Sequence, residues 1–241
     1  MKSKKTALYI LLIYIVMQLS SFLLLRPLFR FIQEQHPELS KNELILTSQG
    51  WYIFISMGIA LILSLILVSR DPNFWKIYKG SKSSIPVSIL WGIIGFFMVF
   101  VGQSIGAMIE NALGIKQGSE NTADLLSIAN VAPIAVIAIA FFGPILEEFV
   151  FRRVIFGSLV QTTNFWVAAL VSSIVFALIH LDFSHIIIYA ISGFIFAFLY
   201  YKTKRIITSI IAHMMLNGFV TVVQFYQKPI EEFLKQLQQL Q

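Results

Sequence analysis

The sequence contains no cysteine, and only 12% of its 241 residues are charged. The lack of cysteine excludes disulfides and thiolate chemistry, both as nucleophile and as metal ligand. A soluble domain carries about twice this share of charge, whereas here 57% of the residues are hydrophobic and the mean hydropathy is +0.80. We therefore expect a polytopic membrane protein. The net charge of +6 does not indicate nucleic-acid binding, because the basic residues cluster at the ends of apolar runs, as topology signals do.

Apolar runs of about 20 residues, the length that crosses a bilayer, recur along the chain. They predict an all-α membrane helix bundle of about seven helices, within a range of about six to eight. The predicted spans are 7–27, 44–68, 85–109, 130–157, 164–182, 185–201 and 206–226. The gaps expected to be loops are 26–43, 69–84 and 110–129. The sequence has no internal repeat, which argues against an inverted-repeat transporter.

Lysine and arginine residues fall in alternate loops, and this pattern predicts the membrane orientation. They are Lys2, Lys4, Lys5, Arg70, Lys76, Lys79, Lys82, Lys202, Lys204 and Arg205. We expect a cytoplasmic N-terminus and, with seven spans, a C-terminus outside. The first apolar run, 7–25, is too long for a signal peptide and precedes no small-residue cleavage site, so it predicts a retained helix. The short loops and the lysine-rich N-terminus are typical of a bacterial inner membrane protein.

The polar groups of catalytic type are distributed unevenly, since nearly all of them lie between residues 147 and 217. The apolar runs of residues 1–129 contain no polar group of catalytic type apart from Ser, Gln and aromatic hydroxyls, and we expect residues 1–129 to frame a catalytic core over residues 130–226. Residues 227–241 repeat apolar side chains at helical spacing opposite Gln, Lys and Glu. This last pattern predicts an amphipathic tail at the membrane interface.

Glu147 and Glu148 are adjacent in an apolar run, although a charge at membrane depth costs about 3 kcal/mol. Arg152 follows Glu148 by four residues, so the two face each other on one helix and both stay charged. Glu147 is rotated by about 100° from Glu148 and need not share Arg152. A glutamate left partly unpaired in apolar surroundings is suited to act as a general base near neutral pH. The alternative is a structural cluster of both glutamates with Arg152 and Arg153.

Two further polar pairs stand at four-residue spacing on later spans, Phe176 with His180 and His213 with Asn217. Alone, His180 beside Asp182 is typical of a capping group, and His213 with Asn217 is equally typical of a helix–helix contact. Together with the glutamates, three successive regions each supply polar groups that can face inward. A carboxylate with an imidazole can activate water, and an imidazole with an amide can donate hydrogen bonds to a developing oxyanion.

These three pairs form ordered motifs, EExxxR, FxxxH and HxxxN/D. They run from Glu147 to Arg152, from Phe176 to His180 and from His213 to Asn217. In this order the chain resembles the CAAX protease and bacteriocin-processing family of intramembrane proteases, also called the Abi family. The resemblance covers about residues 130–225 and is specific because all three motifs lie on apolar spans.

The resemblance implies an intramembrane endopeptidase that hydrolyses a peptide bond in a membrane-associated peptide or a lipidated protein. Glu147 would activate water, and His180 would help to position that water. His213 and Asn217 would stabilise the oxyanion. The supporting residues would be Glu148, Arg152 and Phe176.

The family has been described both as metal-dependent and as glutamate-type, so a divalent metal such as zinc stays open. If present, it would be held by Glu147, His180 and His213 as a three-ligand set. The sequence has no H-E-x-x-H, and the two histidines lie 33 residues apart on separate spans. With Glu147 as ligand, Glu148 would have to be the base, and Arg152 opposes that role by holding it charged. The sequence therefore favours metal-independent chemistry.

Straight spans would place the site residues at different depths, with Glu147 deep, His180 near the outer end of its helix and His213 in the inner half. A helix that begins below the surface, strong tilts or different span boundaries would reconcile them. The short link that follows His180 predicts a tight, buried turn, where Asp182 and His185 are further candidates for the site.

Two other functions fit part of the sequence. A proton-coupled transporter would use the intramembrane Glu and His groups as a relay, and the break at Gly143-Pro144 before Glu147 would suit it as well as a protease. A non-catalytic immunity or regulatory protein of the same fold would carry degenerate motifs, whereas all three motifs are intact. The expected partners are the lipid bilayer and a membrane-associated substrate, with no nucleic acid.

Overall fold

The computed structural model describes residues 2–78 and 80–239, which form helices joined by turns with no strand among them. The predicted all-α class is therefore confirmed. The first helices are α1 (Lys2–Leu19), α2 (Ser21–Gln35), α3 (Lys41–Ser69), α4 (Ile85–Ala112) and α5 (Glu120–Val131). A central rod follows, made of α6 (Ala135–Ile137), the π-helical η1 (Ala138–Phe142), α7 (Gly143–Glu147), the π-helical η2 (Glu148–Phe156) and α8 (Gly157–Leu159). The last helices are α9 (Phe165–Leu178), the 3-10 turn η3 (Phe183–His185), α10 (Ile186–Thr203) and α11 (Ile206–Gln239).

The described residues contain four segments long and apolar enough to cross a membrane, namely α3, α4, Phe183–Thr203 and Ile206–Tyr226. Helices α1 and α2 make a fifth if the pair counts as one span bent by 49°. The chain is thus an integral membrane protein. The predicted number of seven spans stays a prediction, because α9 has only 14 residues and the rod carries four charged ones.

Two segments predicted as loops contain helices instead. Helix α2 occupies much of 26–43, because the chain bends at Ser20, whose hydroxyl hydrogen-bonds Met17 O at 2.8 Å and the Tyr52 hydroxyl at 2.7 Å. Helix α5 begins inside 110–129, where Ser119 Oγ accepts a hydrogen bond from the Thr122 amide at 3.1 Å, and continues to Val131. The serine before an acidic first turn is an N-cap signal that the hydropathy pattern alone does not reveal.

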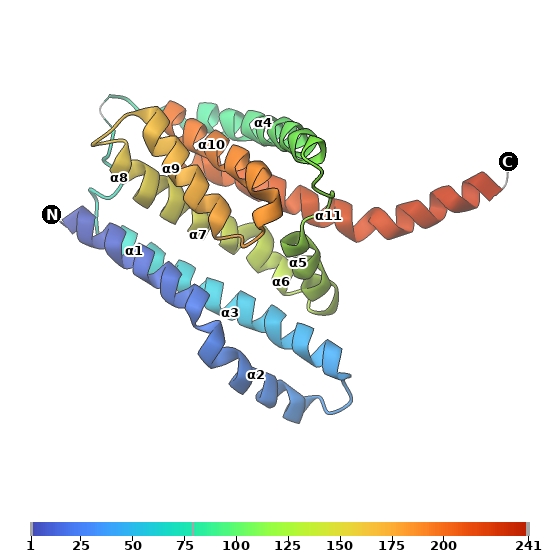
Figure 1. Ribbon diagram of the computed structural model, residues 1–241. Coiled ribbons are helices and arrows are strands. Elements are labelled where there is room, and N and C mark those ends of the chain that lie inside the picture. Colours follow the sequence, from blue (N-terminus) through green and yellow to red (C-terminus); the bar gives the residue numbers. More distant parts are fainter. Residues whose placement is uncertain (1, 79, 240–241) are drawn as a thin grey trace.

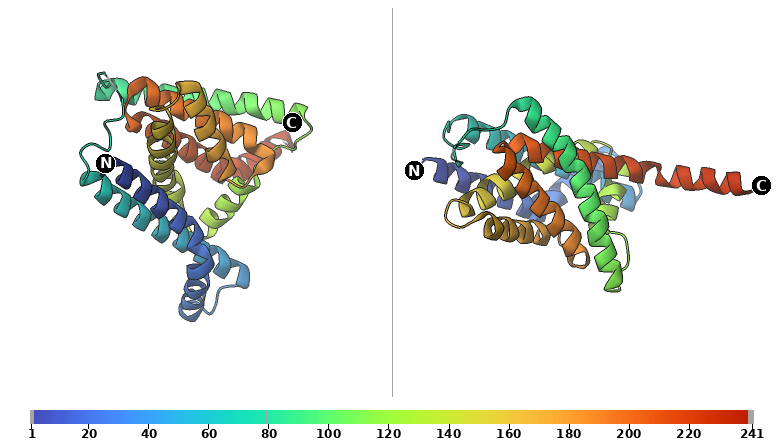
Figure 2. Two further views of the ribbon diagram at one scale, coloured as in Figure 1. Left: turned by 60° about the vertical axis from the view of Figure 1, so that its left-hand side comes forward. Right: turned by 90° about the horizontal axis from the view of Figure 1, so that it is seen from above.

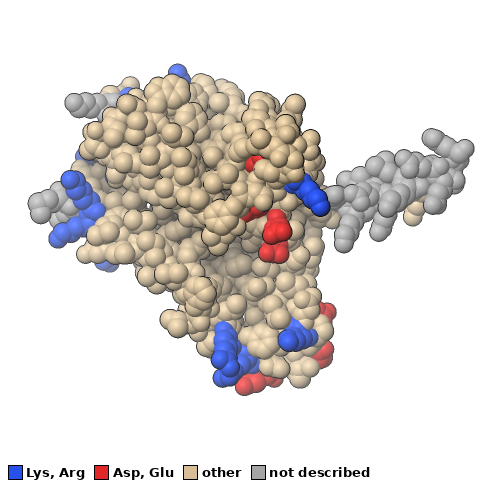
Figure 3. All heavy atoms as spheres, viewed as in Figure 1, with Lys and Arg blue, Asp and Glu red and all other residues tan. Residues whose placement is uncertain are grey.

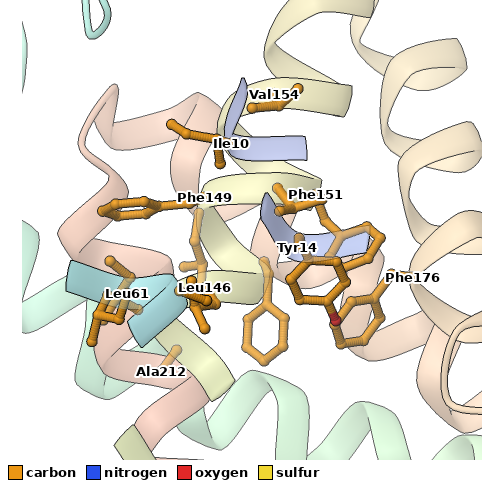
Figure 4. Packing of buried hydrophobic residues seen from close by; sticks show 14 of the residues in the cluster. Ile10, Tyr14, Leu61, Leu146, Phe149, Phe151, Val154, Phe176 and Ala212 are labelled. Atoms are coloured by element: carbon orange, nitrogen blue, oxygen red, sulfur yellow. The ribbon is translucent and has the colours of Figure 1, made fainter. Parts of the chain in front are cut away.

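The rod forms the centre of the bundle. Figures 1 and 2 show α1 and α3 side by side along one flank and α4, α10 and α11 along the other. Figure 4 shows Tyr14 of α1 and Phe176 of α9 next to Phe151 of the rod. Their rings pack edge to face, at 5.9 Å for Tyr14 and 5.3 Å for Phe176. The rod is therefore held from all sides, which fixes the direction of its polar side chains.

Helix α4 lies close to α10 and α11 because small residues line its inner face. A methyl group added at Gly95 would lie 2.4 Å from a Leu199 methyl carbon, and one at Gly92 would lie 2.8 Å from Ile211. Close approach over small residues is the usual way that membrane helices gain packing energy. The N-terminal half therefore touches the motif-bearing helices directly.

The loops predicted to share one membrane side do lie at one end of the bundle. Thr6 donates to Asp71 at 2.8 Å, and the amide of Ser83 donates to Thr203 O at 3.1 Å. At the opposite end His185 Nε2 donates to Gly118 O at 3.0 Å. Figure 3 shows charged side chains gathered toward the ends, with a wide uncharged surface between them. Which end faces the cytoplasm stays a prediction.

The predicted amphipathic tail, residues 227–241, depends on side chains that lie outside the described residues. The helix itself is continuous, since α11 runs from Ile206 to Gln239. Figure 2 shows this last part extending away from the bundle.

Candidate active site

The site is built around a break in the rod just before Glu147. Pro144 has no N–H to donate, and in the π-helical turn the Gly143 amide bonds Ala138 O, five residues back. The carbonyl of Ile139 therefore lacks its partner within the rod. Asn217 of α11 supplies one, because its Nδ2 donates to Ile139 O at 3.1 Å. This hydrogen bond joins Asn217, of the HxxxN motif, to the π-helical turn that precedes the EExxxR motif.

Glu148 is completely buried and held by two cationic or hydrogen-bonding groups. The ion pair expected from the four-residue spacing is present, with Arg152 Nε 3.3 Å from Glu148 Oε2. His213 Nδ1 lies 3.0 Å from Glu148 Oε1. A carboxylate only accepts, so Nδ1 donates and Nε2 points away from Glu148. Glu148 has no contact with solvent and acts as a fixed anchor.

Aromatic rings enclose Arg152 and explain the place of Phe176 in its motif. The guanidinium carbon lies 4.7 Å from the centre of the Phe176 ring and 5.4 Å from that of Phe196. Cation–π contacts of this kind are stronger when desolvated. Ser172 Oγ lies 3.5 Å from Arg152 Nη1. Ser172 and Phe196 belong to no motif, so sequence spacing did not reveal them.

Glu147 differs from its neighbour because 16% of its side chain is exposed. Its Oε2 lies 3.6 Å from His213 Nε2. An N–H at His213 Nε2 would point toward this carboxylate, so the two side chains are placed to share one proton.

His180 lies just beyond the end of α9, with Nδ1 2.8 Å from Phe176 O. A carbonyl only accepts, so Nδ1 is the donor and Nε2 is left as the acceptor of the neutral ring. Although straight spans predict different depths, His180 and Glu147 line the same cavity. Helix α9 has 14 residues and covers about 20 Å, which is shorter than the hydrocarbon core of a bilayer.

A cavity of about 930 Å³ brings the predicted residues together. Its wall includes Glu147, His180 and Asn217, along with Tyr14 of α1. His213 is 3% exposed and lies behind this wall, in contact with both glutamates. Much of the remaining wall comes from segment 115–126, between α4 and the rod. Tyr14 lies in an apolar run with no motif, so its place in the cavity wall becomes evident only from the packing of α1 on the rod.

The two further candidates, Asp182 and His185, are placed differently from the motif residues. His185 lines the same cavity but is 2.7 Å from Glu110 Oε2 through Nδ1 and 3.0 Å from Gly118 O through Nε2. Both of its nitrogens are therefore engaged. Asp182 precedes the 3-10 turn and does not line the cavity.

The arrangement does not fit the metal set considered above. Among the residues described, no group of three His, Asp or Glu side chains could hold a metal ion. His180 donates to the Phe176 carbonyl, and His213 is divided between Glu148 and Glu147.

The helical bundle and its cavity-facing carboxylate, imidazole and amide define an integral membrane protein with a polar intramembrane centre. A family profile described as "Type II CAAX prenyl endopeptidase Rce1-like" matches residues 129–219, which contain all three motifs. A relative from Bacillus subtilis (strain 168), named "Putative membrane peptidase YdiL", is 39% identical over 95% of this chain and 92% of its own length. The chain belongs to the CAAX protease and bacteriocin-processing family.

Two more relatives support this membership. "Membrane-embedded CAAX protease MroQ" of Staphylococcus aureus (strain USA300) is 34% identical over 88% of this chain and 86% of its own. "UPF0177 protein YxdF" of Lactococcus lactis subsp. lactis (strain IL1403) is 44% identical over 77 residues, 32% of this chain and 42% of its own. No solved structure gives a significant match.

Proposed function

We propose that this chain is an intramembrane endopeptidase that hydrolyses a peptide bond in a membrane-associated peptide or lipidated protein. The observation that carries the proposal is the exposure of Glu147, beside His180 and Asn217, to one cavity of about 930 Å³. The volume suits a segment of extended peptide, since ligand sites of about 300–1,000 Å³ are typical. The names of the relatives, a membrane peptidase and a CAAX protease, support the same activity.

In this proposal Glu147 is the general base. When the shared proton resides on His213, Glu147 is ionised and takes a proton from a water molecule in the cavity. The water oxygen then attacks the carbonyl carbon of the scissile bond. As the C–N bond breaks, Glu147 returns the proton to the leaving nitrogen, and the products are a carboxylate and an amine. His180, with Nε2 free to accept, positions the water.

Asn217 is the candidate oxyanion donor. One N–H of its Nδ2 is used by Ile139 O, and the second remains for a substrate oxygen in the cavity. His213, expected from sequence to share this role, keeps its Nε2 toward Glu147. We assign it the positioning of Glu147 and the storage of the shared proton. Glu148, Arg152 and Phe176 hold His213 and the rod in place.

The membrane setting follows the same proposal. With the lysine-rich end in the cytoplasm of a bacterial cell, segment 115–126 and the part of the cavity that it lines would lie toward the external side of the membrane. Reporter fusions at residue 78 and at residue 116 would test this orientation. A cytoplasmic signal at 78 and an external one at 116 is expected, and the reverse pattern would overturn it.

The activity is tested by comparing the peptides of cells that express wild-type protein and Glu147→Gln. A peptide cut only in wild-type cells identifies the substrate, and a quenched fluorescent copy of it then gives kcat and KM for purified protein in nanodiscs. Glu147→Gln and His180→Ala should abolish cleavage while the protein stays folded. Full cleavage by Glu147→Gln, or ion flux without cleavage, would contradict the proposal and favour a transporter.

A further inference from the structure

Tyr189, one turn into α10, belongs to none of the three motifs but lies against His180. The two rings are stacked, with their centres 4.1 Å apart and their planes at 26°. The Phe176 ring meets His180 edge-on at 4.7 Å. The His180 imidazole also donates a hydrogen bond from Nδ1 to the Phe176 carbonyl. The hydrogen bond restrains one edge of the ring, and Tyr189 restrains one face.

Tyr189 is itself held firmly. Its hydroxyl hydrogen-bonds Ser119 Oγ at 3.0 Å and accepts from Asn121 Nδ2 at 3.3 Å. Both partners lie in segment 115–126, which lines the cavity. The ring of Tyr189 therefore touches the site while its hydroxyl ties down part of the cavity wall.

The start of α10 is fixed by a separate set of contacts. Glu110 Oε1 accepts hydrogen bonds from the amides of Ile187 and Ile188, at 3.1 and 3.2 Å. These amides are otherwise unpaired at a helix N-terminus. His185 bonds the other Glu110 oxygen and Gly118 O. Tyr189 lies four residues after His185 and so shares its helix face, which gives the ring a rigid base.

We infer that Tyr189 is a positioning residue for His180, which it holds by ring stacking, and that its hydroxyl keeps segment 115–126 in place for substrate binding. The inference rests on the role proposed for His180. The ring and the hydroxyl of Tyr189 would thus have different functions, which separate variants can test. The ring acts on the chemical step, since a small misplacement of a catalytic group lowers the rate severalfold or more. The hydroxyl acts on binding.

The test uses the quenched peptide with Tyr189→Leu and Tyr189→Phe, measured for kcat, KM and the pH dependence of kcat. Tyr189→Leu removes both the stack and the hydroxyl, so it should lower kcat about tenfold, change the pH profile and raise KM as much as Tyr189→Phe does. Tyr189→Phe keeps the ring, so kcat should stay within about twofold while KM rises. If Tyr189→Leu fails to fold, Tyr189→Met is closer in volume and takes its place.

Tyr201→Leu provides the matched control, because Tyr201 is also on α10 but its ring contacts Tyr78, Phe156 and Phe165 rather than the site. If Tyr189→Leu and Tyr201→Leu have the same kcat and pH profile, the inference is overturned. His180→Ala separates the two levels of the argument. An inactive His180→Ala with a fully active Tyr189→Leu refutes only the role of Tyr189, whereas a fully active His180→Ala refutes the proposed function.

Discussion

Two buried Glu–His pairs among the residues that the structure describes have different surroundings. In one pair His185 bonds Glu110 at 2.7 Å, and the glutamate also accepts two amides of α10. In the other, His213 bonds Glu148 at 3.0 Å. In the first pair both oxygens of Glu110 accept hydrogen bonds, one from His185 and the other from the two amides at the start of α10. In the second, Glu148 Oε2 and the facing Arg152 Nε are paired by charge without hydrogen-bond geometry.

The decisive difference is the third partner. His185 uses its second nitrogen on a backbone carbonyl, which cannot change its charge. His213 turns its second nitrogen toward Glu147, a titratable group on the cavity wall. The same two residue types thus hold a helix in one place and, in our proposal, store a proton in the other. Burial and pairing alone do not mark a catalytic residue.

The largest expected effect comes from Glu147→Gln. Loss of a general base should lower kcat about 1,000-fold, while the midpoint temperature of unfolding stays near that of wild type because glutamine has the same size and still faces the cavity. The quenched peptide gives the rate, and thermal unfolding in nanodiscs gives the stability. Glu110→Gln is the comparison on the other pair and should keep most of the rate. An equal loss of rate in both variants would remove the distinction between the pairs.

The next effect is that of Asn217→Ala, with about 100-fold loss of kcat expected from one missing oxyanion donor. The same change also leaves the Ile139 carbonyl unpaired. Asn217→Asp keeps the size of the side chain but has no N–H, so it should be equally slow and shows that lost volume alone does not cause the effect. A rate for Asn217→Asp close to wild type would exclude an oxyanion role.

His185→Ala should act on stability instead of chemistry. Breaking a buried pair leaves Glu110 uncompensated, and we expect about 3 kcal/mol of destabilisation, with less than a tenfold loss of kcat for the folded fraction. The exposed pair of His36 and Glu38, whose side chains are 56% and 66% exposed, offers a matched control. His36→Ala should leave the unfolding temperature unchanged. A His185→Ala protein that is stable but inactive would place His185 in the catalytic machinery.

The smallest effect on stability is expected for Asp71, at the end of the bundle that we propose to face the cytoplasm. Burial disfavours its carboxylate, but hydrogen bonds from Thr6, the Asn73 amide and Ser3 outweigh burial and lower its pKa from the usual 3.8. A lowered pKa means that the stabilisation is complete above about pH 4 and is lost as the pH falls through the native-state value. Asp71→Asn should lower the unfolding temperature slightly at pH 7 and less at pH 3. A difference that grows toward acid would contradict this sign.

The fold class and the three motifs could be predicted because they depend on local patterns. Apolar runs predict helices, and the four-residue spacing of Glu148 and Arg152 fixes a contact on one helix wherever that helix packs. The alternation of basic loops also predicted which loops share an end. These signals need no knowledge of which helices are neighbours.

The rest depends on contacts between distant segments. Nothing near Glu110 in the sequence indicates His185, and nothing near His180 indicates that Tyr189 stacks on it. The bend at Ser20 depends on Tyr52, a partner on the next helix. The π-helical turn η1 has a local cause, Pro144, which follows it, but the Asn217 side chain that compensates comes from α11. Hydropathy does not encode such pairings.

The most direct test of the central claim is to measure Glu147→Gln and Glu148→Gln side by side in nanodiscs, with the unfolding temperature and the rate of peptide cleavage for each. We predict that Glu147→Gln unfolds like wild type and does not cleave. Glu148→Gln leaves Arg152 buried without its carboxylate and should be destabilised by about 3 kcal/mol. If Glu147→Gln cleaved at the wild-type rate, or if Glu148→Gln were as stable as wild type, the two glutamates would not have the separate roles assigned to them.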